Sequence, residues 1–263
     1  MNVDNRCLDG KVIIITGGTQ GLGEEIASRS AELGASGLVV CGRNVEKGEA
    51  AAGRLSRDSC RTVFVAGELN DVEVCQRIVA RCDEEFGRVD GLVNSAANTE
   101  RGSLEDCSPE HWDKILAINL RAPFLLMQGA VKLMKRGGHG GSIVNISSMS
   151  GHGGQPNLTP YSVSKGGLDT LTKNSAHAFN RDRIRVNGLN IGWMATPSEH
   201  AVQLLEGQPE NWLESADAKQ PFGRILRPSD VASMAVYLLS DASEMMTGAL
   251  VDFDQHVMGI YDP

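Results

Sequence analysis

Short apolar runs rich in β-branched residues alternate along this chain with longer segments of helical periodicity, and this alternation restricts the fold more than any other feature. Residues 11–16, Lys-Val-Ile-Ile-Ile-Thr, are typical of a strand buried on both faces. The segment that follows places Leu22, Ile26 and Leu33 on one helical face. Repetition of strand, helix and strand indicates parallel strands joined by right-handed crossovers, with helices on both faces of the sheet.

The same alternation continues to the end of the chain. We expect strands over residues 11–16, 38–41, 61–66, 90–94, 142–147, 185–190 and 249–253. We expect helices over residues 21–34, 45–56, 71–86, 109–135, 161–179 and 229–239, and a loop-rich stretch over 193–227. No linker-like break or internal repeat interrupts the 263 residues. The sequence therefore predicts an α/β fold: a single doubly wound (Rossmann) domain over residues 1–263, with a parallel sheet of about seven strands.

Charge and apolar content narrow the possible classes of protein. Hydrophobic residues make up 41% of the chain, which provides for a sizeable core and excludes intrinsic disorder. The 33 acidic side chains outnumber the 25 basic ones, and a net charge of -8 argues against a nucleic-acid or anionic-membrane partner. The arginine cluster over residues 181–185 is short and interrupted by an aspartate, so we interpret it as a solvated corner.

The cysteines and the N-terminus bear on metal binding and location. The six cysteines include no Cys-x-x-Cys pair, and none lies beyond residue 107. We therefore expect free thiols, with neither a disulfide framework nor a metal site. The N-terminus has no apolar signal segment, and the longest apolar runs are far below the ~20 residues that span a bilayer. These features predict a soluble cytoplasmic protein.

A glycine-rich turn, residues 16–23, joins the first predicted strand to the first predicted helix. Ligands of doubly wound sheets bind outside the carboxyl ends of the strands. Gly17, Gly21 and Gly23 would let the backbone approach a pyrophosphate, whose charge the N–H groups at the helix N-terminus would meet. This context predicts a dinucleotide site, with a purely structural turn as the alternative.

Tyr161 and Lys165 share one face of a predicted helix because they are four residues apart. A nearby ammonium group lowers the pKa of a phenol towards working pH, which makes tyrosine a usable acid and base. The alternative is an exposed helix with a solvated lysine.

Taken together, these features resemble the short-chain dehydrogenase/reductase family over about residues 8–255. The family's motifs are T-G-x-x-x-G-x-G, an N-N-A-G-like segment after the fourth strand, a serine thirteen residues before Y-x-x-x-K, and P-G-x-x-x-T after the sixth strand. In this sequence they correspond to residues 16–23, residues 94–97, Ser148, Tyr161 with Lys165, and residues 191–196.

The resemblance implies a role for each matching residue. Tyr161 would be the general acid and base, and Ser148 would hydrogen-bond the substrate oxygen. Lys165 would lower the pKa of the phenol and bind the nicotinamide ribose, while Asn119 would support a proton-relay water. The residues that would contact the cofactor are Gly17, Gln20, Gly21, Leu22, Gly23, Arg43, Glu68, Leu69, Asn94, Ala96, Tyr161, Lys165 and Thr196. The implied reaction is hydride transfer between NAD(P) and a secondary alcohol or ketone.

Some positions depart from the family's pattern. They are Ser95, Ala97, Ile191, Glu68 in place of an aspartate, and residues 251–256, which lack a glycine pair. None of them belongs to the serine, tyrosine and lysine set, although Ser148 could instead cap a strand end and Asn119 could bond helix backbone. A catalytically silent cofactor-binding regulator is expected to have lost part of that set, so we favour an active enzyme.

The residues after the second strand favour NADP over NAD. An NAD enzyme usually presents an acid there, whose carboxylate binds the adenosine ribose and repels a 2′-phosphate. Here the chain reads Cys-Gly-Arg-Asn, residues 41–44. The arginine, Arg43, can make charge-assisted hydrogen bonds to phosphate, or it could stack on adenine or face solvent.

Polar residues near the expected substrate pocket suggest a sugar or polyol as the small-molecule substrate. The stretch 193–227 would close over the substrate, and the candidate contacts are Ser150, His152, Gln155 and Trp193. The alternative activity is reduction of a 3-oxoacyl thioester, for which an acidic chain offers less of the basic docking surface that an acyl carrier needs.

The resemblance also implies self-association. Helices 109–135 and 161–179 resemble the pair that forms the family's tetramer interface. We therefore expect a homo-oligomer, either a tetramer or a dimer.

Overall fold

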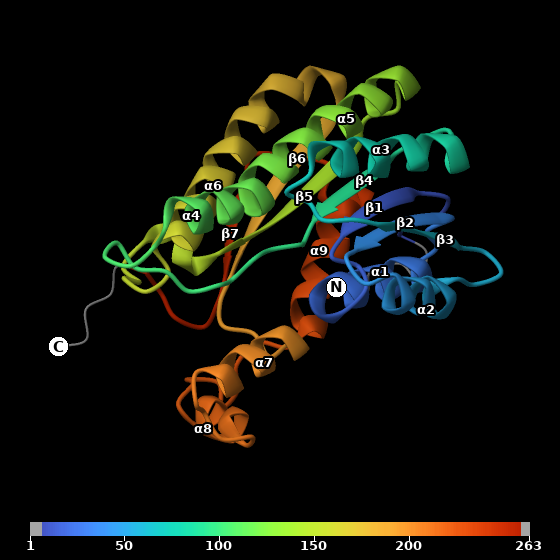
Figure 1. The fold of residues 1–263 in the computed structure, drawn as a ribbon. Helices are drawn as coiled ribbons and strands as arrows, with labels where there is room; N and C mark the ends of the chain where they lie inside the picture. The colour runs from blue at the N-terminus through green and yellow to red at the C-terminus, as the bar shows by residue number, and fades with distance from the viewer. Residues whose placement is uncertain (1–6, 259–263) are drawn as a thin grey trace.

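The computed structural model describes residues 7–258 and contains one seven-stranded parallel sheet (Figure 1). Its spatial order is β3-β2-β1-β4-β5-β6-β7, so strand addition changes direction between β1 and β4. The strands are β1 (Val12–Thr16), β2 (Gly37–Gly42), β3 (Arg61–Ala66), β4 (Gly91–Asn94), β5 (Gly141–Ser148), β6 (Ile184–Ile191) and β7 (Leu250–Phe253). This order confirms the predicted doubly wound fold and places a ligand crevice at the carboxyl ends of the central strands.

Helices cover both faces of the sheet (Figure 1). One layer contains α1 (Gly21–Glu32), α2 (Val45–Leu55) and α9 (Pro228–Leu239). The other contains α3 (Val72–Phe86), α4 (Pro109–Leu116), α5 (Ala122–Gly137) and α6 (Thr159–Phe179). Short 3₁₀ segments are η2 (Met149–His152), η3 (Asn180–Asp182) and η4 (Asp241–Ser243). Among the described residues, no helix is long and apolar enough to cross a membrane.

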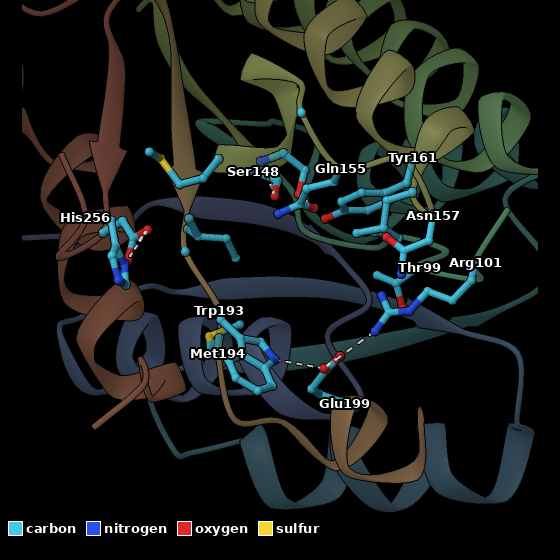
Figure 2. A pocket seen from close by; sticks show the side chains of 18 of the residues that line it. Thr99, Arg101, Ser148, Gln155, Asn157, Tyr161, Trp193, Met194, Glu199 and His256 are labelled. Carbon is cyan, nitrogen blue, oxygen red and sulfur yellow. Dashed lines mark hydrogen bonds and ion pairs between the residues drawn. The ribbon is translucent and has the colours of Figure 1, made fainter. Parts of the chain in front are cut away.

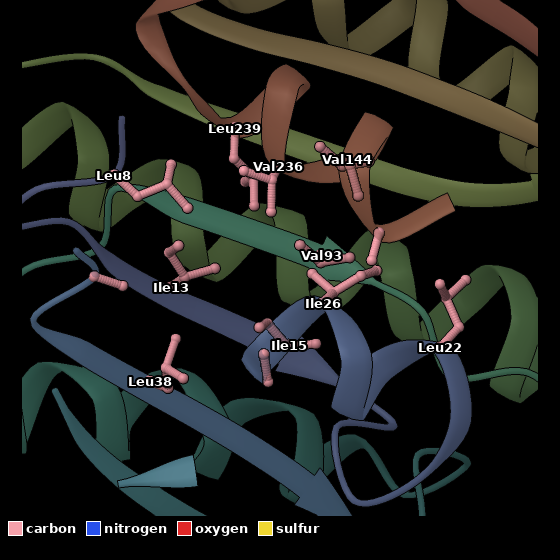
Figure 3. Close-up of a cluster of buried hydrophobic side chains, with 14 of the residues drawn as sticks. Leu8, Ile13, Ile15, Leu22, Ile26, Leu38, Val93, Val144, Val236 and Leu239 are labelled. Atoms are coloured by element: carbon pink, nitrogen blue, oxygen red, sulfur yellow. The ribbon is translucent and has the colours of Figure 1, made fainter. Parts of the chain in front are cut away.

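The core has two parts, one on each face of the sheet. Successive side chains of β1 point to opposite faces, and both faces are covered, so every residue of the strand is buried. Ile13 and Ile15 pack with α1 and α9, where Ile26 is fully buried (Figure 3). Val12 and Ile14 pack on the opposite side against α3 and α5. The two clusters fix the helices that carry the site residues.

Two predictions about secondary structure are wrong in part. The stretch predicted as a loop over residues 193–227 contains α7 (Pro197–Leu205) and α8 (Trp212–Ala218). Thr196 begins α7 as its cap, since its hydroxyl accepts from the N–H of Glu199 at 3.1 Å. Buried Trp212 anchors α8 in a small separate cluster with Ala216 and Ile225.

The helix predicted over residues 109–135 is interrupted by a π-helical segment, η1 (Ala117–Arg121), between α4 and α5. The π segment surrounds Asn119, whose buried side chain leaves the helix to bind a neighbouring loop. Such a bulge is frequent at functional sites. The predicted start of the helix is confirmed, because the Ser108 hydroxyl caps α4 and Pro109 occupies its first turn.

Candidate active site

The glycine turn after β1 holds the backbone closer than any other residue type would allow. Gly17 and Gly21 have φ angles of 68° and 55°. A Cβ at Gly23 would lie 2.4 Å from the carbonyl oxygen of Gly17, so α1 packs directly on the turn. Gln20, the N-cap residue of α1, makes no capping hydrogen bond with its side chain. The first N–H groups of α1, which include that of Leu22, are therefore suited to a pyrophosphate.

Two cations lie beside this turn. Arg43 follows β2 and is exposed, while the Asn44 side chain caps α2. Lys47 is in the first turn of α2, and its ammonium group contacts the side-chain oxygen of Gln20. Sequence reasoning missed Lys47, although its position four residues after Arg43 at a helix start was the available signal.

An acidic side chain at position 42 would require Thr19 to move. A Cβ there would lie 2.8 Å from the hydroxyl oxygen of Thr19, which is part of the glycine turn. Gly42 therefore ends β2 in close contact with Thr19, and Arg43 is the first residue beyond the strand.

The residues predicted to lie around adenine differ in how far they are buried. Glu68 is exposed after β3, and its side chain makes no contact that assigns it a role. Leu69 is half-buried against the core under α3. Asn94 is buried at the end of β4, where its amide donates to Asn145 at 2.7 Å and leaves its own oxygen without a partner in the described chain. The hydroxyl of Thr16 accepts from the N–H of Ala96 at 3.0 Å, which ties this segment to the glycine turn.

Asn119 connects the loop after β4 to the start of α6. Its side chain accepts from the N–H of Asn98 at 2.7 Å and donates to the carbonyl oxygen of Asn98 at 2.9 Å. It also donates to Ser164, which in turn donates to the backbone carbonyl of Tyr161. The side chain thus positions the helical turn that carries the phenol.

Ser148, Tyr161 and Lys165 come together at the carboxyl end of β5. The Ser148 hydroxyl accepts from the N–H of Ser150 at 3.1 Å and lies beside the Tyr161 phenol. Lys165 is 3% exposed, and its ammonium donates to the carbonyl oxygen of Ile146 at 2.7 Å. The Lys165 ammonium lies 5.6 Å from the centre of the Tyr161 ring.

Burial dominates the titration of both groups. It raises the pKa of the Tyr161 phenol, and the hydrogen bond with Ser148 opposes that rise. Burial also lowers the pKa of Lys165 to about 8, with Asp169 acting in the opposite direction. In this structure the Lys165 ammonium donates to the Ile146 carbonyl, so the effect of Lys165 on the pKa of the phenol stays a prediction.

A cavity of about 780 Å³ opens in front of this group (Figure 2). Ser148, Tyr161, Ser150 and Gln155 line one side, and Ser150 donates to Gln155 at 2.7 Å. Figure 2 shows Trp193 and Glu199 on the other side. Thr196 also lines the cavity and lies next to Gly21 of the glycine turn.

His152 is not among the residues that line this cavity, so its role as a substrate residue stays a prediction. Its ring nitrogen Nε2 lies 3.0 Å from a carboxylate oxygen of Asp252 on β7. Asn190 donates to the same oxygen at 2.9 Å. The imidazole is therefore held against the edge of the sheet, since η2 turns its side chain away from Ser148.

Among residues 7–258, no three His, Cys, Asp or Glu side chains are grouped so that they could hold a metal ion. Ser148 and Tyr161 bring a hydroxyl and a phenol to the cavity wall. A phenol beside a serine hydroxyl, at the ligand edge of a doubly wound sheet, is suited to exchange a proton with an alcohol oxygen. This arrangement defines a dinucleotide-dependent oxidoreductase of alcohols and ketones.

Comparisons with known proteins agree with this class. Residues 17–255 match the family model described as enoyl-(acyl carrier protein) reductase. The NADP-dependent (R)-specific alcohol dehydrogenase of Lentilactobacillus kefiri is 38% identical over 245 residues, which cover 92% of this chain and 94% of that protein. The L-rhamnose 1-dehydrogenase (NAD(P)(+)) of Sphingomonas sp. (strain SKA58) is 30% identical over 254 residues, 96% of this chain and 98% of that protein.

A solved structure is similar over almost the whole fold. L-sorbose reductase from Gluconobacter frateurii, in complex with NADPH and L-sorbose, has a TM-score of 0.90 and 27% identity. The match covers 98% of this chain and 100% of that one. The protein belongs to the short-chain dehydrogenase/reductase family, as its motifs predict.

Proposed function

We propose that this protein reduces a ketone group of a sugar or related polyhydroxylated compound with NADPH, and oxidises the corresponding secondary alcohol with NADP in the reverse direction. The observation that carries the proposal is that Ser148 and Tyr161 lie together at the wall of one cavity. The nicotinamide, when bound, supplies or accepts the hydride.

In this proposal the chain's own residues position the carbonyl and transfer the proton. Ser148 and Tyr161 both hydrogen-bond the carbonyl oxygen, and Tyr161 donates its phenolic proton as that oxygen gains charge. The ammonium group of Lys165 lies behind the phenol and stabilises the phenolate that is left. Asn119 positions the first turns of α6 through its bonds to Asn98 and Ser164.

We assign cofactor binding to the turn after β1 and to the ends of the neighbouring strands. Gly17, Gly21 and Gly23 fit a group that approaches the backbone closely, because added side chains would strain or clash there. Arg43 and Lys47 would attract the 2′-phosphate. The NADP in the name of the L. kefiri relative and the NADPH in the sorbose reductase complex support this choice of cofactor.

The polar lining of the cavity supports a hydroxylated substrate. Gln155, Asn157, Arg101, Glu199 and Gln203 contribute amide or charged groups to it. The L-rhamnose dehydrogenase and L-sorbose reductase relatives act on sugars by their names, which agrees with such a lining.

We further propose a homo-oligomer formed through α4, α5 and α6. A shallow apolar hollow lies on these helices, lined by Leu116, Leu120 and Leu171, with the 48% exposed Phe124 beside them. Burying this surface against a second copy would remove it from water. Sedimentation equilibrium of the wild-type protein and of Phe124→Glu tests this, and equal masses would contradict it.

We place the protein in the cytoplasm. Cys41, Cys60, Cys75 and Cys82 are buried free thiols, and burial raises the pKa of each above its ordinary value. Unpaired thiols of this kind suit a reducing compartment.

The test is a substrate panel followed by nicotinamide absorbance with NADPH. The panel contains a ketohexose, a simple ketone of the same chain length and a 3-oxoacyl thioester. We expect the highest kcat/KM for the ketohexose. A higher value for the thioester would contradict the proposed substrate class and favour an acyl-chain reductase.

A further inference from the structure

Glu199 lies in the wall of the cavity that faces Tyr161. One oxygen of its carboxylate accepts hydrogen bonds from the protein, and the other is available to a ligand. Oε1 of Glu199 accepts from the indole N–H of Trp193 at 2.8 Å and from the amide of Gln203 at 2.9 Å. The Arg101 guanidinium lies 3.9 Å from the same oxygen. Within residues 7–258, Oε2 has no hydrogen-bond partner, yet it is not sealed from solvent.

Glu199 is held in this position from both sides of the cavity. It lies in the first turn of α7, whereas Arg101 comes from the loop after β4 (Figure 2). Arg101 is fixed in turn, since its Nε donates to Glu206 at 2.7 Å. The Glu199 side chain is only 14% exposed, so its carboxylate is oriented before any ligand arrives.

Glu199, Arg101 and the reacting Tyr161 all line the same cavity. Glu199 raises the pKa of Tyr161 and Arg101 lowers it, although burial is the larger cause. A ketone whose oxygen binds Tyr161 would therefore extend its carbon chain towards these two side chains. They offer it a charged acceptor next to a charged donor.

We propose that Glu199 and Arg101 form the subsite that selects a hydroxylated carbon chain, with Oε2 of Glu199 accepting a hydrogen bond from a substrate hydroxyl. A hydroxyl group can donate to the carboxylate and accept from the guanidinium at the same time. An alkyl chain would leave Oε2 of Glu199 without a donor, and this makes it the poorer ligand. The inference rests on the proposed function and specifies which side chains determine its substrate class.

The test compares two ketones of equal chain length, a 2-ketohexose and 2-hexanone, at saturating NADPH. Glu199→Gln keeps the shape of the side chain. Its amide oxygen must accept from Trp193 and Gln203, so an N–H₂ group replaces Oε2. Exchange of a charged for a neutral hydrogen bond should lower kcat/KM for the ketohexose about 10-fold, mostly through KM. The value for 2-hexanone should change by less than about 3-fold, since no hydrogen bond to it is lost.

Glu210→Gln is the matched control. Glu210 is an exposed carboxylate in the segment after α7 and does not line the cavity. We expect nearly unchanged kcat/KM for both ketones in this variant. Circular dichroism and thermal unfolding of both variants check that α7 remains folded.

The outcomes separate the two claims. Equal losses for both ketones in Glu199→Gln, with the wild type still preferring the ketohexose, would overturn the subsite and leave the proposed function intact. A wild-type enzyme that shows no preference for the ketohexose would overturn the proposed substrate class and the subsite with it.

Discussion

Replacement of Arg43 with alanine should weaken the binding of NADPH and leave the binding of NADH almost unchanged. Arg43 is the first side chain after the Gly42 end of β2, and the Lys47 ammonium lies nearby at the glycine turn. Only NADPH carries a 2′-phosphate, so only NADPH should lose a charge-assisted hydrogen bond in the variant.

The exposure of these side chains sets the size of the effect. Hydrogen bonds to charged groups contribute about 1.5–3 kcal/mol, and the low end applies because Arg43 is exposed. That value corresponds to a roughly 10-fold rise in the Kd of NADPH. Lys47→Ala should raise it only about 1.4- to 5-fold, the range of an exposed ion pair of about 0.2–1 kcal/mol.

Nucleotide fluorescence gives both dissociation constants directly, and kcat/KM with each cofactor gives an independent comparison. Arg61→Ala removes a cation at the opposite end of the sheet, where β3 begins, and serves as the control. A loss of equal size for NADH and NADPH would refute the reasoning, since it would show that Arg43 acts on a part that both cofactors share. An unchanged Kd for NADPH would refute it as well.

Three further predictions follow from the structure. Because burial lowers the pKa of Lys165 to about 8, the unfolded chain binds more protons between pH 8 and about 10.5. The unfolding free energy of the wild type should therefore rise with pH in that window relative to Lys165→Met, as measured by chemical denaturation; parallel pH profiles would contradict this. Gln155→Ala should change the ratio of kcat/KM values across a ketone panel, whereas His152→Ala should not, because only Gln155 lines the cavity; a changed ratio in His152→Ala would support its predicted role. Gly23→Ala places a Cβ 2.4 Å from a backbone oxygen, so it should cost about 1–3 kcal/mol of stability and weaken cofactor binding. Gly53→Ala meets nothing within 4 Å and should stabilise α2. Equal melting temperatures of the two variants would count against the close contact at Gly23.

The fold could be predicted because its strands are buried on both faces and its helices are amphipathic over several turns. β1 is apolar at every position except Thr16, and that pattern needs no knowledge of distant contacts. The helices α7 and α8 could not be predicted in this way. They are short, and α8 is anchored by Trp212 in contacts with Ile225, a residue well beyond its end.

In the candidate site, too, the local features could be predicted from the sequence and the long-range contacts could not. The spacing of Ser148, Tyr161 and Lys165 is a local property of the sequence, and the structure brings the three together. The direction of His152 depends on where β7 places Asp252, one hundred residues further along the chain. The contact of Lys47 with Gln20 and the grouping of Arg101 with Glu199 are likewise long-range, so only the folded arrangement reveals them.

The most direct test of the account is single-turnover reduction of a ketohexose by Tyr161→Phe, with the Kd of NADPH measured on the same preparation. The account predicts a loss of at least ~10²-fold in the rate of NADPH oxidation, because the variant has no phenolic proton to donate. The Kd should stay close to that of the wild type, since the Tyr161 hydroxyl is bound to Ser148 and not to the glycine turn. A near-normal rate with intact NADPH binding would contradict the assignment of Tyr161 as the proton donor.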